Sequence, residues 1–352
     1  MIGSRARTLL FGALVALGLL GVAVVAVRQP AGAGDYLAIW GLKARALSRS
    51  GTLSSLFRVD PAGLAAHPEY PPLWPATLAV FSSLAGPYDD LIVTLLWPLL
   101  ALAASLLAMR ATRAAAPEKI LAGAALALLP YFRTPVYVGY AEALLVVLLL
   151  GALSEVDRNT PGAPFRLALF LALACLTKNE GLVASAVFIA VLVGARRFRT
   201  AGIAAALVLL VGILPWALYR RALLGPLALA DFSVASFRPD KLVLAARAIT
   251  AEAIVPSSLW LIGAAVLLLL APATCRRRAA VLIGMLLYVG TLFLSFAFSS
   301  LDLAWHVRWS WDRLALVPIA LIIPVLVEAA VECISTEGLS PSRTFTGATG
   351  VH

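Results

Sequence analysis

The residues best suited to chemistry in this sequence are ionisable side chains at the ends of long apolar segments. Asp35 follows Gly34 a few residues beyond the first apolar segment and is the leading candidate for a general base. A carboxylate held there, between a membrane helix and a surface helix, is placed to take a proton from an acceptor hydroxyl. The alternative interpretation of Asp35 is a helix N-cap, since an acid also favours the start of the helix that follows.

A second candidate group lies in the run His67-Pro68-Glu69-Tyr70-Pro71-Pro72. We interpret His67, Glu69 and Tyr70 as the rim of a binding site for a sugar or a phosphate. The alternative is an ordinary proline-rich helix start with Tyr70 as an interface anchor. Asp35 and Glu69 together could hold a divalent ion, because hard cations prefer carboxylate oxygens. Two carboxylates alone do not define a metal site, so we predict no metal and no cofactor.

Three further charged residues interrupt apolar segments, where a charge is costly unless it is paired or hydrated. Glu142 precedes a purely apolar run, and Arg133 is its candidate partner; the alternative is a carboxylate that only starts a helix. Lys178 is suited to bind a phosphate oxygen as a point charge, with Glu180 beside it. The alternative for Lys178 and Glu180 is a polar turn with a local ion pair.

The last candidate group is the aromatic and basic run from Trp305 to Arg313. Its tryptophans are typical of a membrane-interface belt, which is one interpretation of the whole run. The other interpretation is binding of a lipid phosphate or a stacked sugar ring by His306, Arg308 and Arg313.

The composition determines which elements must position these residues. Of the 352 residues, 62% are hydrophobic and 13% are charged, and the mean hydropathy is +0.95. A soluble domain is about 45–50% apolar and about 25% charged. The sequence therefore excludes a soluble globular protein, a disordered chain and a nucleic-acid-binding domain, and it predicts an all-α polytopic membrane protein.

The apolar segments predict about ten to eleven membrane helices in one transmembrane catalytic domain over residues 1–328. We expect a polar, disordered tail over 329–352. A complete crossing needs about 20 residues, so the shorter segments are expected to be tilted, broken or re-entrant. The apolar segments are 8–27, 73–86, 91–109, 120–138, 140–155, 167–177, 181–195, 201–219, 259–272, 280–298 and 314–327.

Arginine-rich connections at 196–199 and 276–278 are expected on the cytoplasmic side. The basic residues before the first apolar segment and after the third are expected on the same side of the membrane, so one of these three segments does not cross. The segment 73–86 is the best candidate. The alternative is that 165–195 forms one broken helix. With the first arrangement, the extracytoplasmic segments are 28–72, 220–258 and 299–313.

The first outer loop contains an amphipathic pattern between residues 36 and 50. Apolar residues recur at spacings of three and four, and basic residues fall between them. This pattern predicts a helix that lies in the outer membrane interface with its basic face in water. The apolar positions are Leu37, Trp40, Ala44 and Leu47, and the basic positions are Lys43, Arg45 and Arg49.

The order of these motifs resembles the polytopic GT-C-fold glycosyltransferases, which include protein O-mannosyltransferases, the lipid A aminoarabinose transferase and bacterial galacturonosyl-type transferases. The resemblance covers nearly the whole chain. It rests on an acid after the first span, a surface helix, a proline-rich motif, an acid before an apolar run, a Thr-Lys-x-x-Gly-like stretch and an aromatic, Arg-bearing segment. In this order they are Gly34-Asp35, 36–50, His67 to Leu73, Gly139 to Glu142, Leu176 to Leu182 and 305–313.

The resemblance implies a GT-C-like helix bundle and transfer of a sugar from a polyprenyl-phosphate donor on the outer side of the membrane. Asp35 matches the catalytic acid of the family, and His67 and Glu69 match the segment that lines the donor site. Glu142 stands where relatives often have Asp. The acidic pair found in some members is reduced here to Asp35 followed by Tyr36, which argues against metal dependence.

We therefore expect an inverting glycosyltransferase in a bacterial inner membrane, with its active site facing outward. Its expected partners are the polyprenyl-phosphate sugar, a glycan, lipid or protein acceptor and membrane lipids, and no nucleic acid. The alternatives are a secondary transporter or flippase for a lipid-linked or anionic substrate, and a non-catalytic scaffold. A transporter would show internal repeats, and the sequence shows none.

Overall fold

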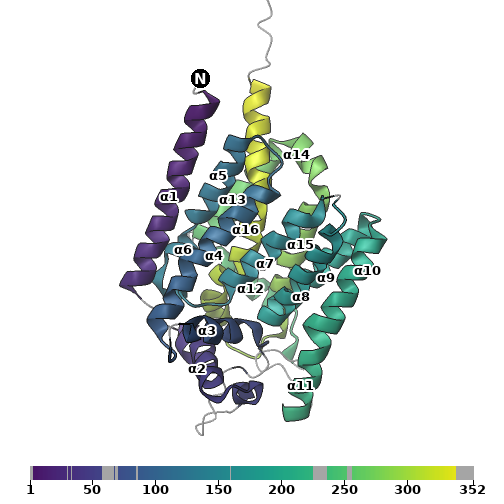
Figure 1. Ribbon diagram of the computed structural model, residues 1–352. Helices are drawn as coiled ribbons and strands as arrows, with labels where there is room; N and C mark the ends of the chain where they lie inside the picture. The colour runs from purple at the N-terminus through teal and green to yellow at the C-terminus, as the bar shows by residue number, and fades with distance from the viewer. Residues whose placement is uncertain are drawn as a thin grey trace, which may run out of the picture.

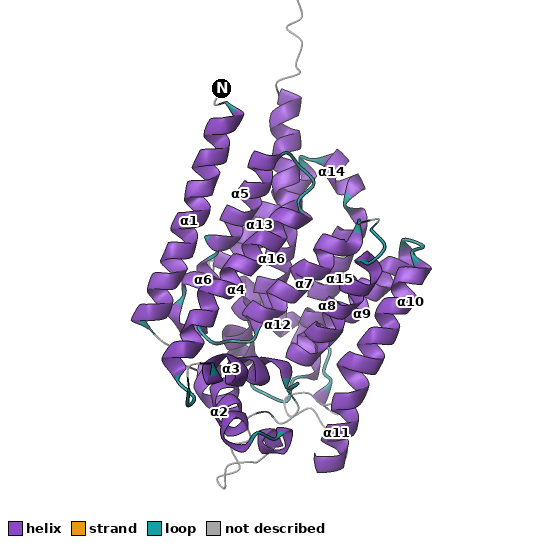
Figure 2. Cartoon of the chain, viewed as in Figure 1, coloured by secondary structure: helices purple, strands orange, loops and turns teal. Residues whose placement is uncertain are grey.

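The computed structural model describes residues 3–337 apart from 30, 33, 58–66, 68–69, 85, 159, 225–235 and 252–255. The elements of this described part are helices (Figure 2). They are α1 (Ser4–Arg28), η1 (Tyr36–Trp40), α2 (Gly41–Ser50), η2 (Leu53–Phe57), α3 (Leu73–Ser83), α4 (Asp90–Ala111), α5 (Ala116–Ala127), α6 (Pro130–Arg133), η3 (Pro135–Tyr137), α7 (Glu142–Val156), α8 (Ala163–Thr177), α9 (Asn179–Gly194), α10 (Phe198–Leu207), η4 (Val208–Ile213), α11 (Leu214–Leu224), α12 (Asp240–Ala251), α13 (Pro256–Leu269), α14 (Pro272–Arg277), α15 (Ala279–Ser295), η6 (Phe296–Phe298) and α16 (Leu303–Glu337).

Five of the described helical segments are long and apolar enough to cross a membrane: α1, α4, Phe198–Ala222, Ala279–Phe298 and the greater part of α16. A span of 25 residues is about 37 Å long, which exceeds the hydrocarbon thickness of about 30 Å. The chain is an integral membrane protein with an all-α fold, as its composition predicts. The expected number of ten to eleven membrane helices stays a prediction.

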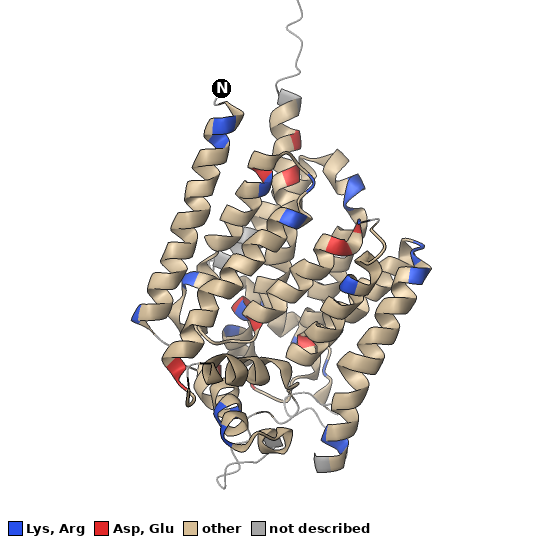
Figure 3. Cartoon of the chain, in the orientation of Figure 1, with Lys and Arg blue, Asp and Glu red and all other residues tan. Residues whose placement is uncertain are grey.

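Different helices and loops lie at the two ends of the bundle (Figure 1), and charged residues occur at both ends (Figure 3). The N-terminus, α14 and the Arg-rich turn between α9 and α10 lie at one end (Figure 1), which we expect on the cytoplasmic side from the positive-inside rule. The helices α2 and α3 lie at the opposite end (Figure 1), which we call the outer end because we expect it on the extracytoplasmic side. With 11 residues, α3 is about 16 Å long, which is shorter than the hydrocarbon thickness of about 30 Å. That 73–86 does not cross stays a prediction.

The helices α8 and α9 form a hairpin whose tip is Lys178. The hydroxyl of Ser185 on α9 donates to the carbonyl of Leu171 on α8 at 3.0 Å, so the two helices run antiparallel from the tip. A Cβ on Gly181 would collide with the carbonyl of Ala174, so glycine is needed for this close approach. One broken helix over 165–195, the alternative arrangement, is therefore not what the chain forms.

The centre of the bundle is α7, which is buried on nearly every side. After its first residue, Glu142, the next eleven residues are apolar or glycine, so the helix has no face suited to water. It packs against α4, α8 and α16. Burial of α7 therefore carries the carboxylate of Glu142 into the interior at the end of the bundle that holds α2 and α3.

The last helix continues beyond the point where we expected a tail. Residues 329–337 extend α16 to Glu337, and residues 338–352 lie outside the described part. The extension is explained by two acids on α16. Glu328 pairs with the buried Arg278, and Glu332 accepts hydrogen bonds from the backbone N–H groups of Ala273 and Thr274 at 2.9 and 2.6 Å.

Candidate active site

Five charged residues from four parts of the sequence meet near the outer end of the bundle, and we call them the ion-pair chain. Arg313 contacts Oδ2 of Asp35, and its Nη1 atom lies 3.9 Å from Oε1 of Glu142. Lys178 Nζ lies 2.8 Å from the same Glu142 oxygen and 2.9 Å from Oε1 of Glu180. Negative and positive groups thus alternate along the ion-pair chain from Asp35 to Glu180.

The middle of the ion-pair chain is buried and its ends are accessible. The side chains of Glu142 and Lys178 are 2% and 6% exposed, while those of Asp35 and Glu180 are 31% and 20% exposed. The second oxygen of Glu142, Oε2, is buried without a hydrogen-bond partner. Buried charges persist only when they are paired, so the inner residues fix the geometry, while the two outer carboxylates are paired but accessible.

Asp35 is held on both its backbone and its side chain. Its N–H donates to the hydroxyl of Tyr140 at 3.0 Å, and the guanidinium of Arg313 lies over the ring of Tyr140 at 5.4 Å from the centroid. The Asp35 side chain makes no capping hydrogen bond, so the N-cap interpretation is wrong. Among the described residues, Oδ1 of Asp35 has no hydrogen-bond partner, whereas Oδ2 is paired with Arg313.

The residue after Asp35 anchors the loop. Tyr36 is fully buried, and its hydroxyl donates to Oδ1 of Asp90 at 2.5 Å and lies 2.9 Å from the hydroxyl of Tyr88. Arg45 on α2 pairs with the other Asp90 oxygen at 2.5 Å. Burial and the hydrogen bond to Asp90 raise the pKa of Tyr36 well above its ordinary value, so Tyr36 remains a neutral donor. This junction fixes the π-helical turn η1 next to Asp35.

Glycine at position 139 makes the packing of Tyr36 possible. Gly139 has φ +87°, and a Cβ there would fall against the ring of Tyr36. Its carbonyl also accepts a hydrogen bond from the indole N–H of Trp74 at 2.8 Å. The loop before α7 is therefore shaped to receive Tyr36, and with it the segment that carries Asp35.

The orientation predicted for α2 is partly wrong. Trp40 and Ala44 are buried as expected, but Leu37 is exposed and Lys43 is buried. Lys43 donates to the carbonyl of His67 and lies 5.8 Å from the ring centroid of Tyr70. Lys43 and Arg45 therefore bind protein groups, which are His67, Tyr70 and Asp90, while Arg49 is exposed as expected.

The aromatic residues of the proline-rich motif form a stack with α2. Tyr70 stacks on Trp40 at 5.2 Å and on His67 at 4.7 Å. His67 has φ +47°, in the left-handed region that favours glycine, and the Lys43 contact helps to hold it there. Tyr70 also interacts electrostatically with Lys178. Tyr70 is thus near Lys178 and His67 stacks on Tyr70, while Glu69 lies outside the described residues.

Among the other expected residues, Arg308 and Arg133 are exposed. His306 lies on α16 seven residues before Arg313, on the same side of the helix, and its Nδ1 atom is 2.7 Å from the hydroxyl of Ser299. Its part in substrate binding stays a prediction. Arg308 is exposed on α16, about 140° around the helix from Arg313. Arg133, the candidate partner of Glu142, is also exposed, and Lys178 takes that role.

Several residues of the site were not expected from the sequence. Tyr140 was noticed only as part of a motif, and the roles of Tyr36 and Asp90 were not predicted. The available signal was the position of each aromatic next to an acid or a glycine, as in Asp35-Tyr36 and Gly139-Tyr140. Among the described residues, no group of three or more His, Cys, Asp and Glu side chains is placed to hold a metal ion.

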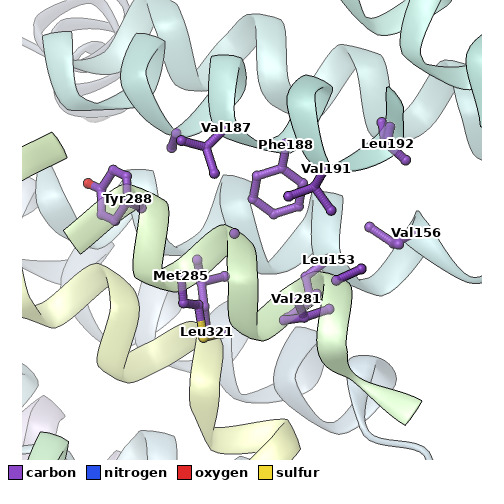
Figure 4. Close-up of a pocket in the computed structure, with 13 residues that line it drawn as sticks. Leu153, Val156, Val187, Phe188, Val191, Leu192, Val281, Met285, Tyr288 and Leu321 are labelled. Atoms are coloured by element: carbon purple, nitrogen blue, oxygen red, sulfur yellow. The ribbon is translucent and has the colours of Figure 1, made fainter. Parts of the chain in front are cut away.

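An apolar cavity of about 50 Å³ lies between α9 and α15, with walls from α7 and α16 (Figure 4). Tyr288 lies at one end of the cavity, and its hydroxyl points away from the other labelled residues (Figure 4). That hydroxyl is buried without a hydrogen-bond partner and interacts electrostatically with Glu180 and Lys178. Tyr288 thus lines the apolar cavity and is within electrostatic range of Glu180 and Lys178.

The helix bundle and the loop that carries Asp35 define the class of fold: the chain has the fold of the GT-C membrane glycosyltransferases. The solved structure that shows this is ArnT from Cupriavidus metallidurans, a GT-C lipid A aminoarabinose transferase, in complex with undecaprenyl phosphate. The TM-score is 0.63 at 16% sequence identity, and the match covers 93% of this chain. The fold implied by the sequence motifs is confirmed.

This chain spans 60% of the length of the ArnT chain. No protein-family model matches the sequence, and no curated protein sequence is significantly similar to it. The identity of 16% means that the likeness concerns the fold, so the chemistry has to be argued from the site itself.

Proposed function

We propose that the protein is a glycosyltransferase that moves a sugar from a polyprenyl-phosphate donor to an acceptor hydroxyl on the extracytoplasmic side of the membrane. The observation that carries the proposal is the convergence of Asp35, Arg313, Glu142 and Lys178, which are far apart in sequence, near the outer end of the bundle. These residues supply both a base for a hydroxyl and cations for a phosphate.

The surroundings of the ion-pair chain suit an amphiphilic donor. A lipid-linked sugar needs an apolar place for its chain next to charged groups for its phosphate. Tyr288, which lines the apolar cavity between α9 and α15, is within electrostatic range of Glu180 and Lys178. We place the first isoprene units in this cavity and the phosphate near Lys178, where the Tyr288 hydroxyl is a further donor. This arrangement supports a lipid-linked donor over a soluble sugar nucleotide.

The proposed reaction is a single inverting displacement. The acceptor oxygen forms a bond to C1 of the sugar while the bond between C1 and the phosphate oxygen breaks. Asp35 accepts the proton of the acceptor hydroxyl, which contributes about 10²–10⁴-fold to the rate. The electron pair leaves with the polyprenyl phosphate, whose negative charge Lys178 stabilises. No general acid is needed, because a phosphate is already a good leaving group.

A transport function is the second candidate from the sequence. Transporter sites lie near the middle of the membrane, between repeats that rock against each other. Here the ion-pair chain opens at Asp35, beside surface helices at the outer end of the bundle, which supports chemistry on that side. The transport of a lipid-linked sugar without its transfer would be the observation in favour of this alternative.

The experiment that tests the proposal replaces Asp35 by Asn in the native host and analyses the cell-envelope glycans. Asp35→Asn keeps the size of the side chain and removes the base, so we expect the product glycan to disappear while the protein level is unchanged. Asp240→Asn is the matched control, because Asp240 is exposed and its ion pair is with its near neighbour Arg238. Unchanged glycans in Asp35→Asn cells with normal protein levels would contradict the proposal.

A further inference from the structure

The ion-pair chain has one more negative than positive group. Asp35, Glu142 and Glu180 are acids, and Arg313 and Lys178 are bases. An entering phosphate adds negative charge at the Lys178 end, so it must compete with Glu142 and Glu180 for that ammonium group. The pairing within the ion-pair chain therefore has to change when the donor binds.

Arg313 is placed to serve either of two carboxylates. It contacts Oδ2 of Asp35, while Oε1 of Glu142 is 3.9 Å away. A shift of the guanidinium by about 1 Å would bring it to an ordinary hydrogen-bond distance from Glu142. The ring of Tyr140, 5.4 Å from Arg313, can support the guanidinium in both positions, since a cation over a ring face is weakly directional.

Glu142 provides the driving force for such a shift. Its side chain is 2% exposed, and its Oε2 atom is already without a hydrogen-bond partner. If Lys178 turns to a phosphate, Glu142 is left as a buried and unpaired charge, which is strongly unfavourable. Arg313 is the nearest cation to replace Lys178. Asp35, which is 31% exposed, is able to exchange Arg313 for water or for an acceptor hydroxyl.

We infer that binding of the donor phosphate shifts the pairing along the ion-pair chain by one position. Lys178 passes from Glu142 to the phosphate, Arg313 passes from Asp35 to Glu142, and the Asp35 carboxylate is released to accept the proton. This inference rests on the proposed function. It makes Arg313 and Glu142 positioning residues. The base is then available only when the donor is bound, because the donor favours the arrangement in which Arg313 is paired with Glu142 and not with Asp35.

Glu142→Gln and Glu180→Gln form a matched pair for the test. Each removes one carboxylate from Lys178, so both are expected to bind undecaprenyl phosphate at least threefold more tightly than the wild type. Only Glu142 offers Arg313 a second carboxylate. The transfer rate constant in a single turnover is therefore expected to fall at least tenfold further in Glu142→Gln than in Glu180→Gln. Glu142→Asp, which keeps the charge, is expected to restore most of the rate.

A second measurement uses only the wild-type protein and no turnover. A carbodiimide modifies accessible carboxylates, and the extent of Asp35 modification can be read by peptide mass spectrometry. Undecaprenyl phosphate, which carries no sugar, is expected to increase the modification of Asp35 at least threefold, because it frees this carboxylate from Arg313. Modification that is unchanged or reduced by undecaprenyl phosphate would overturn the inference, even if Glu142→Gln does not fold.

The failure of the inference is distinguishable from the failure of the proposed function. If the wild type binds undecaprenyl phosphate and transfers a sugar, but the two glutamine variants slow the transfer equally, only the exchange of ion pairs is wrong. Weaker carrier binding by Glu142→Gln would have the same meaning. If the wild type neither binds undecaprenyl phosphate nor transfers a sugar, the proposed function fails and the exchange fails with it.

Discussion

Replacement of Lys178 by Met tests how far the buried part of the ion-pair chain holds the fold together. Lys178 lies 2.8 Å from Glu142 and 2.9 Å from Glu180. Its loss leaves Glu142 in the interior with only Arg313 nearby, at 3.9 Å. Glu180 is 20% exposed and regains water. Removal of one partner of a buried pair costs about 3–5 kcal/mol, and the nearby Arg313 places the expected loss near 3 kcal/mol.

The free energy of unfolding is measured by titration with SDS in mixed micelles. The double variant Lys178→Met with Glu142→Gln is expected to recover most of the loss, because no buried charge is left unpaired. Lys119→Met is the control: Lys119 is exposed, and a change within about 0.5 kcal/mol is expected. A loss below about 1 kcal/mol for Lys178→Met, or a double variant no more stable than the single one, would refute the reasoning.

Three further predictions concern the loop and the cavity. Gly139→Ala combines a strained φ with a collision against Tyr36, so we expect a loss of about 2–5 kcal/mol in the same titration, and an unchanged value would contradict this packing. Burial raises the pKa of Tyr88 to about 12, against 10.0 for the free side chain. The contribution of Tyr88 to the free energy of unfolding is therefore complete below pH 10 and is lost as the pH rises toward 12. Between about pH 8 and 12, the free energy of unfolding should fall less steeply in Tyr88→Phe than in the wild type, and identical pH profiles would exclude this contribution. Gly284→Leu fills the cavity beside α9 and should weaken binding of undecaprenyl phosphate at least tenfold. Gly290→Leu is the control, because Gly290 lies on the open face of α15 and its replacement should leave binding unchanged. Equal affinities of the two variants would place the isoprene units elsewhere.

The positions of the buried charges in the sequence predicted much of the site. A charge inside an apolar segment is unfavourable unless it is paired, so Glu142 and Lys178 were recognisable as residues that need partners. Asp35 was recognisable from its place between a membrane span and a surface helix. Composition alone predicted the all-α membrane fold, because only helices satisfy their own backbone hydrogen bonds over such apolar lengths.

The pairing of these charges was beyond the reach of the sequence. Arg313 and Asp35 are 278 residues apart, and only the packing of α16 against the rest of the bundle brings them together. Arg313 was assigned to a phosphate, and Arg133 to Glu142, because charge patterns do not specify partners. Lys43 was placed in water because helical spacing shows which residues share a face but not what covers that face.

The claim on which the account depends is that Asp35 acts as a base on a sugar carried by a polyprenyl phosphate. The most direct measurement is transfer from a radiolabelled polyprenyl-phosphate sugar by purified protein in proteoliposomes, with binding of undecaprenyl phosphate measured in parallel. We predict that the wild type consumes the donor, and that Asp35→Asn lowers the transfer rate by about 10² or more while binding is retained. Equal transfer rates for the wild type and Asp35→Asn would contradict the account.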